Sequence, residues 1–205
     1  MKYSVIDLFC GCGGLSEGFK LAGFNIVGGI DFNQKAIDTY KKNFKNATAI
    51  CADLMAFNEK DIHTNFPNLN KVDVIIGGPP CQSWSEAGMM KGIEDARGQL
   101  FFDFIRMLKD KQPKFFVAEN VSGMLSKRHE EAVNNIIKMF EDAGYNMHIK
   151  LLNANDYNVP QDRLRVFYIG FRKDLKDKLS LEDAFEKKLE NQTSGDAVSM
   201  NSNVI

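Results

Sequence analysis

Cys81 is the residue of this sequence whose surroundings most favour covalent chemistry. It stands in GGPPCQSWSEAG (residues 77–88), directly after the apolar run VDVII (72–76). The two glycines release the chain from a strand, and the two prolines then fix two φ angles and remove two hydrogen-bond donors. A thiol held by such a stiff loop is a nucleophile once it is ionised, so Cys81 is predicted to be catalytic rather than a buried cysteine beside a structural turn.

A glutamate and a pair of arginines could complete a pocket around this thiol. Glu119 lies near the end of KFFVAEN (114–120), where a carboxyl group with a raised pKa in an apolar setting could donate a proton to a substrate ring nitrogen. Arg163 and Arg165 alternate in QDRLR (161–165), so they share one side of an extended segment and suit an anion, a phosphate or a carbonyl oxygen. Taken alone, the glutamate is uninformative, and the arginines equally fit an exposed, charged strand start.

A glycine-rich turn, CGCGG, is the second candidate site. Gly11, Gly13 and Gly14 permit a tight turn and a close approach of backbone to a ligand, but their spacing is not that of a dinucleotide site and no phosphate-binding lysine follows. Asp31 could accept hydrogen bonds from two ribose hydroxyls, and Asp53 could accept one from an adenine amino group. The pattern suggests an adenosine-containing ligand without pyrophosphate; the alternative is a strand–helix turn with surface acids.

Short apolar runs that alternate with helical patterns must position these groups. Most of the runs lack period-two alternation, as strands buried on both faces do, so we expect an α/β fold with an open, mostly parallel sheet flanked by helices. Ligands of such sheets bind at the carboxyl ends of the strands. The predicted strands are 4–9, 24–30, 72–78, 114–120, 145–154 and 165–171, and the predicted helices are 15–23, 34–44, 98–110 and 130–144.

Composition limits the class of protein. The 205 residues carry a net charge of -1, which argues against a strongly basic nucleic-acid module but not against an enzyme that meets nucleic acid through one local surface. We expect one cofactor-binding catalytic domain over residues 1–172 and a polar connector or tail over 173–205.

Cysteine usage and hydropathy indicate a cytoplasmic protein. No apolar run approaches the roughly 20 residues of a membrane span. The four cysteines show no disulfide-framework spacing, so reduced thiols are expected. Cys10 and Cys12 lack nearby histidines or further cysteines, and no metal site is predicted.

Five motifs of the chain, taken in order, resemble the motif set of the DNA cytosine-5 methyltransferases. They are DLFCGCGG, GGPPCQSWSEAG, RGQLFF, AEN and QDRLRVFYIG. The resemblance covers about residues 3–172. It implies a Rossmann-like fold that uses S-adenosylmethionine, in an enzyme of the bacterial or phage modification type, as found in restriction–modification. It also implies that the cysteine attacks carbon 6 of a cytosine flipped out of double-stranded DNA, and that carbon 5 receives the methyl group.

The resemblance gives each motif residue a role. At the base, Cys81 would be the nucleophile and Glu119 would bind ring nitrogen 3 and the exocyclic amine. The Pro80 carbonyl would accept from the same amine, while Arg163 and Arg165 would hold the base carbonyl and a nearby phosphate. The residues implied in cofactor binding are Phe9 at the adenine, Gly11, Gly13 and Gly14 at the methionine portion, Asp31 with Phe32 at the ribose, Asp53 with Leu54 at the adenine amino group, and Leu100 through its backbone.

The chain departs from the family pattern after its last motif. No variable target-recognition region is visible, and SGDAVSMNSNVI (194–205) only vaguely resembles the start of the closing motif. A second chain carrying target recognition is therefore one expectation. The alternatives are a tRNA cytosine-5 methyltransferase and a non-catalytic cofactor-binding fragment or half of a split enzyme; a nicotinamide dehydrogenase is disfavoured by the turn spacing.

Overall fold

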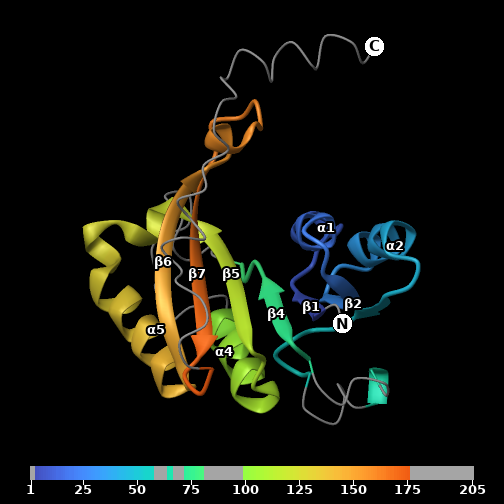
Figure 1. Ribbon diagram of the computed structural model, residues 1–205, viewed down its shortest axis with the longest axis horizontal. Coiled ribbons are helices and arrows are strands. Elements are labelled where there is room, and N and C mark those ends of the chain that lie inside the picture. Colours follow the sequence, from blue (N-terminus) through green and yellow to red (C-terminus); the bar gives the residue numbers. More distant parts are fainter. Residues whose placement is uncertain (1–2, 58–63, 67–71, 81–98, 176–205) are drawn as a thin grey trace.

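A computed structural model describes residues 3–57, 64–66, 72–80 and 99–175 (Figure 1). Its strands are β1 (Ser4–Leu8), β2 (Asn25–Asp31), β3 (Thr48–Cys51), β4 (Val74–Gly77), β5 (Phe115–Val121), β6 (Tyr145–Asn153) and β7 (Leu164–Arg172). The α-helices are α1 (Gly14–Leu21), α2 (Gln34–Asn43), α4 (Gln99–Lys111) and α5 (Glu130–Asp142), and short 3-10 helices are η2 (Ser122–Leu125), η3 (Lys127–His129) and η4 (Ala154–Tyr157).

The strands form one seven-stranded sheet in the order β3-β2-β1-β4-β5-β7-β6. The pairs from β3 to β5 are parallel, whereas β7 runs antiparallel to both β5 and β6. Figure 1 shows α1 and α2 beside β1 and β2, with α4 and α5 toward the other end of the sheet. The expected α/β fold with an open, mostly parallel sheet is confirmed.

The lack of alternation in the strands has the predicted cause, because each central strand packs on both faces. In β4, Val74 and Ile76 join the cluster that includes Ile37 and Tyr40 of α2. Ile75, between them, faces the opposite cluster together with residues of α4 and α5. Since successive side chains of a strand point to opposite faces, a strand covered by helices on both sides must be apolar throughout.

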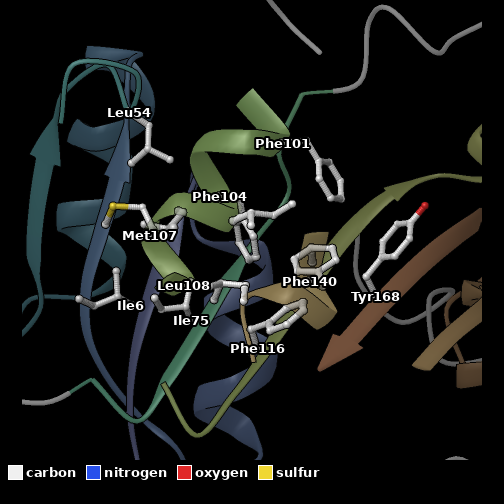
Figure 2. Packing of buried hydrophobic residues seen from close by; sticks show 14 of the residues in the cluster. Ile6, Leu54, Ile75, Phe101, Phe104, Met107, Leu108, Phe116, Phe140 and Tyr168 are labelled. Atoms are coloured by element: carbon white, nitrogen blue, oxygen red, sulfur yellow. The ribbon is translucent and has the colours of Figure 1, made fainter. Parts of the chain in front are cut away.

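Aromatic rings fix α4 and α5 against β5 and β7 (Figure 2). The Phe116 ring of β5 stacks on Phe140 of α5, with centroids 4.6 Å apart, and meets Phe104 of α4 edge-on at 5.8 Å. Phe140 also lies near Tyr168 of β7, at 6.4 Å. This packing holds the two strands that carry Glu119 and Arg165.

The predicted elements are confirmed, with ends that differ by one or two residues; β4, for example, spans Val74–Gly77 where 72–78 was expected. The helix predicted to end at Gly144 ends at Asp142, and Gly144 closes it just beyond the cap: its φ is 96°, and its N–H donates to the Glu141 carbonyl at 3.0 Å. Within the described ranges, no helix is long and apolar enough to cross a membrane. β7 ends at Arg172, and most of 173–205 lies outside the described residues, so the domain limit stays a prediction.

The reversed direction of β7 matters for the site. β7 begins where β5 ends, so that Arg165 pairs with Val121 and Phe167 with Glu119 in the register of the two strands. The start of an antiparallel strand thereby reaches the same sheet edge as the carboxyl ends of its parallel neighbours.

Candidate active site

A cavity of about 660 Å³ opens at the carboxyl edge of the parallel strands. Its wall comes from the end of β1 and the turn after it, from the loop after β4, and from β5, β6, η4 and β7. Of the predicted site residues, it is lined by Phe9, Gly14, Glu119, Arg163 and Arg165. Groups predicted separately for the base and for the adenosine ligand therefore share one pocket.

Glu119 forms an ion pair with Arg165 inside this cavity. Arg165 Nε lies 2.8 Å from Glu119 Oε1, and both side chains are partly exposed. A partly exposed ion pair stabilises the fold by about 1 kcal/mol at most, so its main effect is to orient the carboxylate. The setting of Glu119 is thus an ion pair rather than the apolar surroundings expected from the sequence.

The proline loop starts directly beside Glu119. A Cβ atom at Gly78 would lie 3.3 Å from Glu119 Oε2. The next residue is tied down by Asn120, whose Nδ2 donates to the Pro79 carbonyl at 3.3 Å while its Oδ1 accepts from the Val121 N–H at 2.8 Å. Pro80 is the last described residue of the loop, and Cys81 lies outside the described residues.

The glycine turn is closed by backbone bonds and by Asp31. The Gly13 N–H donates to the Cys10 carbonyl at 2.9 Å, and the Gly11 N–H donates to Asp31 Oδ2 at 2.9 Å. Asp31 Oδ1 accepts from the Asn33 N–H at 2.8 Å. Asp31 therefore joins the turn after β1 to the end of β2, in addition to any role toward a ribose.

Comparison with known proteins supplies the deciding observation. The sequence model of the C-5 cytosine-specific DNA methylase family matches residues 3–204. The chain belongs to this family. It is 49% identical to the Type II methyltransferase M.NgoPII of Neisseria gonorrhoeae, covering 96% of this chain and 62% of the relative. It is 57% identical to M.FnuDI of Fusobacterium nucleatum, covering 83% of this chain and 47% of the relative.

Solved structures agree with the family assignment. A prophage-encoded protein of E. coli described as a DNA modification methyltransferase superposes with a TM-score of 0.77 at 36% identity, over 88% of this chain and 50% of that one. The Dnmt2 methyltransferase of S. pombe gives a TM-score of 0.68 at 25% identity, over 92% and 55%. This methylase chain spans about half the length of the proteins that it matches.

Several predicted cofactor residues of the methylase chain do not line the cavity. Phe32 is 71% exposed, and Asp53 is exposed and accepts from the Met55 N–H at 3.0 Å. Leu54 is buried in the core, so any ligand contact would come from its backbone. Leu100 is partly buried in the first turn of α4. Gly11 and Gly13 shape the turn without lining the cavity.

Sequence reasoning missed several residues that line the cavity, among them Asp7, Tyr157 and Phe167. Asp7 could have been found, because it is the one charged residue in the buried run SVIDLF. Tyr157 belongs to η4, and no sequence signal places that turn at the cavity. Sequence reasoning also missed Asn120, which is 3% exposed and anchors the proline loop.

Phe9 has an unusual backbone. Its φ is 61°, in the left-handed region that non-glycine residues rarely adopt, and its side chain packs against the core beside the cavity. Such strain persists only where the surroundings impose it, which is common at ligand sites. In the described part of the chain, no group of three or more His, Cys, Asp or Glu side chains is arranged to hold a metal ion.

Gly13→Ala is expected to destabilise the methylase chain by about 3 kcal/mol, because φ is 95° and the new Cβ would overlap the Phe44 ring. Gly18→Ala is the matched control: it lies in α1 with no atom within 4 Å of its Cβ position, and it should leave stability unchanged or raise it by up to about 1 kcal/mol. Urea unfolding of both variants measures the difference. Equal stabilities would contradict the packing described.

If Cys81 reacts covalently with cytosine, as proposed in the next subsection, Asn120→Ala is expected to slow that reaction about tenfold, because one buried hydrogen bond that anchors the proline loop is lost; the affinity for the proposed cofactor should change less than about twofold. The readout is the rate of covalent trapping on DNA that carries 5-fluorocytosine, set against the dissociation constant for S-adenosylhomocysteine. The exposed Asn25→Ala serves as control. If the trapping rate and the affinity for S-adenosylhomocysteine fell to the same extent, the variant would have a general folding defect, and the specific role of Asn120 would be refuted.

Proposed function

We propose that this chain carries the cofactor-binding and catalytic part of an enzyme that transfers a methyl group from S-adenosylmethionine to carbon 5 of cytosine in double-stranded DNA. The observation that carries the proposal is Glu119, oriented by Arg165 at the cavity and adjoining the loop that leads to Cys81. Membership of the cytosine-specific family supports the substrate base.

The cavity fits S-adenosylmethionine. Its volume of about 660 Å³ lies within the range of small-molecule sites, roughly 300–1,000 Å³. Gly14 lines it, and the position of a Cβ there is open space that a ligand can fill. Phe9 offers an apolar face in the lining, while Asp31 and Asp53 stand outside the lining, near the ends of β2 and β3. When bound, the cofactor supplies a methyl group on a positively charged sulfur.

The chain's own residues would activate the base. The Cys81 thiolate forms a bond to carbon 6, and the ring electrons move to carbon 5, which gains the methyl group. Glu119 donates a proton to ring nitrogen 3 as negative charge develops there, while its other oxygen and the Pro80 carbonyl accept hydrogen bonds from the exocyclic amine. Loss of the carbon 5 proton to a base then expels Cys81, and return of the ring nitrogen proton to Glu119 restores the ring.

The remaining groups would hold the substrate. Arg163 and Arg165 line the cavity and suit the base carbonyl and a nearby phosphate. The cytosine has to leave the duplex before attack, which costs a few kcal/mol. Because the chain spans about half the length of its relatives, DNA recognition by a further segment or a second chain belongs to the same proposal.

Transfer of radiolabelled methyl groups from S-adenosylmethionine tests the function. Duplex DNA of mixed sequence, tRNA and a buffer blank are compared, and the product base is identified by chromatography. We expect 5-methylcytosine in DNA alone. Label in tRNA would establish the RNA alternative, and cofactor binding without transfer to either would identify a non-catalytic fragment.

A further inference from the structure

Arg106 on α4 is bonded to the turn that follows β3. Its Nη2 donates to the Leu54 carbonyl at 2.8 Å, between residues that lie 52 positions apart in the sequence. The Arg106 side chain is about one third exposed, and no step of the proposed reaction uses its guanidinium. The bond therefore joins a helix on one side of the sheet to the segment that carries Asp53 and Leu54.

Two carboxylates of the same helix hold the guanidinium in place. Arg106 Nε lies 3.2 Å from Asp103 Oδ1, and Arg106 Nη1 lies 3.7 Å from Asp110 Oδ2. Ion pairs at these helix spacings add little to stability. They do, however, fix the direction of a planar group whose N–H donors have a rigid geometry, so that Nη2 is held toward the Leu54 carbonyl.

The turn after β3 is held in shape by local hydrogen bonds. Asp53 Oδ1 accepts from the Met55 N–H at 3.0 Å. The Asp53 carbonyl accepts from the Ala56 N–H at 3.1 Å, and the Leu54 carbonyl accepts from the Phe57 N–H at 3.3 Å. Bonds between near neighbours define the form of a turn, but they do not set its orientation relative to the rest of the fold.

The side chain of Leu54 anchors this turn without orienting it. Leu54 is 3% exposed and belongs to the same core cluster as Phe104 and Met107 of α4 (Figure 2). Hydrophobic burial is not directional, so it leaves the rotation of the adjoining peptide groups open. The hydrogen bond from Arg106 supplies the missing direction, because such bonds weaken steeply when donor and acceptor are misaligned.

One peptide group connects Arg106 with the carboxylate of Asp53. The Leu54 carbonyl and the Met55 N–H belong to the same planar peptide unit. On one side this unit accepts from Arg106, and on the other it donates to Asp53 Oδ1. A guanidinium that fixes the carbonyl therefore also fixes the N–H and the carboxylate that it meets, and it polarises the peptide so that the N–H becomes a better donor.

We propose that Arg106 is a positioning residue for the adenine end of S-adenosylmethionine. Through the Leu54–Met55 peptide it holds the Asp53 carboxylate in the orientation that accepts a hydrogen bond from the adenine amino group. The inference rests on the proposed function, together with the contact of Asp53 that the family resemblance implies. Arg106 itself does not touch the cofactor, so its loss should affect the recognition of one ligand group and not the ligand as a whole.

The test compares two ligands on the intact chain by calorimetric titration at pH 7.5: S-adenosylhomocysteine and its analogue in which hydrogen replaces the adenine amino group. A hydrogen bond to a carboxylate is stronger than one between neutral groups, so the wild-type chain is expected to bind S-adenosylhomocysteine about 10- to 30-fold more tightly than the analogue. A tie between α4 and the turn that served stability alone would affect both ligands equally.

Arg106→Lys keeps the positive charge near Asp103 and Asp110, but a single ammonium group cannot meet these acids and the Leu54 carbonyl together. We expect the preference for S-adenosylhomocysteine to fall to about threefold or less, while the affinity for the analogue changes less than about twofold. The matched control is Lys109→Ala, at an exposed position of α4, which should keep the wild-type preference.

Asp103→Asn is the second variant, for the case that Arg106→Lys does not fold. It leaves the guanidinium in place but removes the charge that pairs with Nε, and an intermediate preference of about fivefold is expected. Equal losses for both ligands, or an unchanged preference, would overturn the role of Arg106. A wild-type chain that binds the two ligands equally would overturn it too, because Asp53 would then not meet the amino group, and the cofactor assignment would stand. Failure to bind either ligand would overturn that assignment as well.

Discussion

Cys81→Ser is expected to lower methyl transfer by at least about 10⁴-fold, because a serine hydroxyl is not ionised near neutral pH and removal of a covalent nucleophile disables the entire reaction sequence. The measurement is denaturing mass spectrometry after incubation with S-adenosylmethionine and duplex DNA that carries 5-fluorocytosine. Fluorine cannot leave carbon 5 as a proton does, so a working enzyme stays attached to its substrate. The wild-type chain should gain the mass of the DNA strand, and the variant should not.

Cys51→Ser is the matched control for this experiment. Cys51 is an exposed, free thiol at the end of β3, and its loss should leave trapping unchanged. An adduct that persists in Cys81→Ser and disappears in Cys51→Ser would show that Cys51 is the nucleophile instead of Cys81. The affinity for S-adenosylhomocysteine should be the same in all three proteins, since neither thiol is proposed to hold the cofactor.

Glu119→Gln is expected to reduce the rate of methyl transfer about 10²- to 10³-fold, with little change in cofactor affinity. Glutamine keeps the size of the side chain but has no acidic proton to give to ring nitrogen 3, and it loses the charge that pairs with the Arg165 guanidinium. The effect should fall on the maximal rate, because the glutamate contacts the base most strongly as charge develops on the ring. Single-turnover kinetics with saturating DNA measures it.

Glu17→Gln is the control for Glu119. Glu17 also forms an ion pair, at 2.9 Å to Lys20, but on the exposed surface of α1. Its loss should change the rate less than twofold and stability by under about 0.5 kcal/mol. A Glu119→Gln chain with full activity would refute the proposed contact with the base.

The fold could be predicted because its signals are local. The central strands are apolar on both faces, and the glycine at the end of α5 is required by a positive φ, so neighbouring residues suffice to place these elements. The direction of β7 is a different matter. Whether it pairs parallel or antiparallel with β5 depends on a connection through β6, and no nearby residue encodes it.

The candidate site residues could be predicted only where a short local motif marks them. Short motifs identified Glu119 and Arg165, but the contact between them joins residues on separate strands. The bond from Asn120 to Pro79 likewise links distant segments, so the asparagine was not recognised. Asp31 shows the converse: its distance from the glycine turn fitted a ribose ligand, and the carboxylate also serves the turn itself.

The place of β7 between β5 and β6 has a consequence for the order in which the molecule assembles. The parallel strands up to β5 can pair as soon as they are synthesised, and until β7 arrives the open side of β5 is an unprotected edge. In the sheet β6 bonds to β7 and not to β5, so β7 is the strand that covers this edge. Arg165 reaches Glu119 only once β7 has paired with β5. A chain in which β6 and β7 have not yet paired would therefore lack both the oriented carboxylate and the part of the cavity wall that these strands supply.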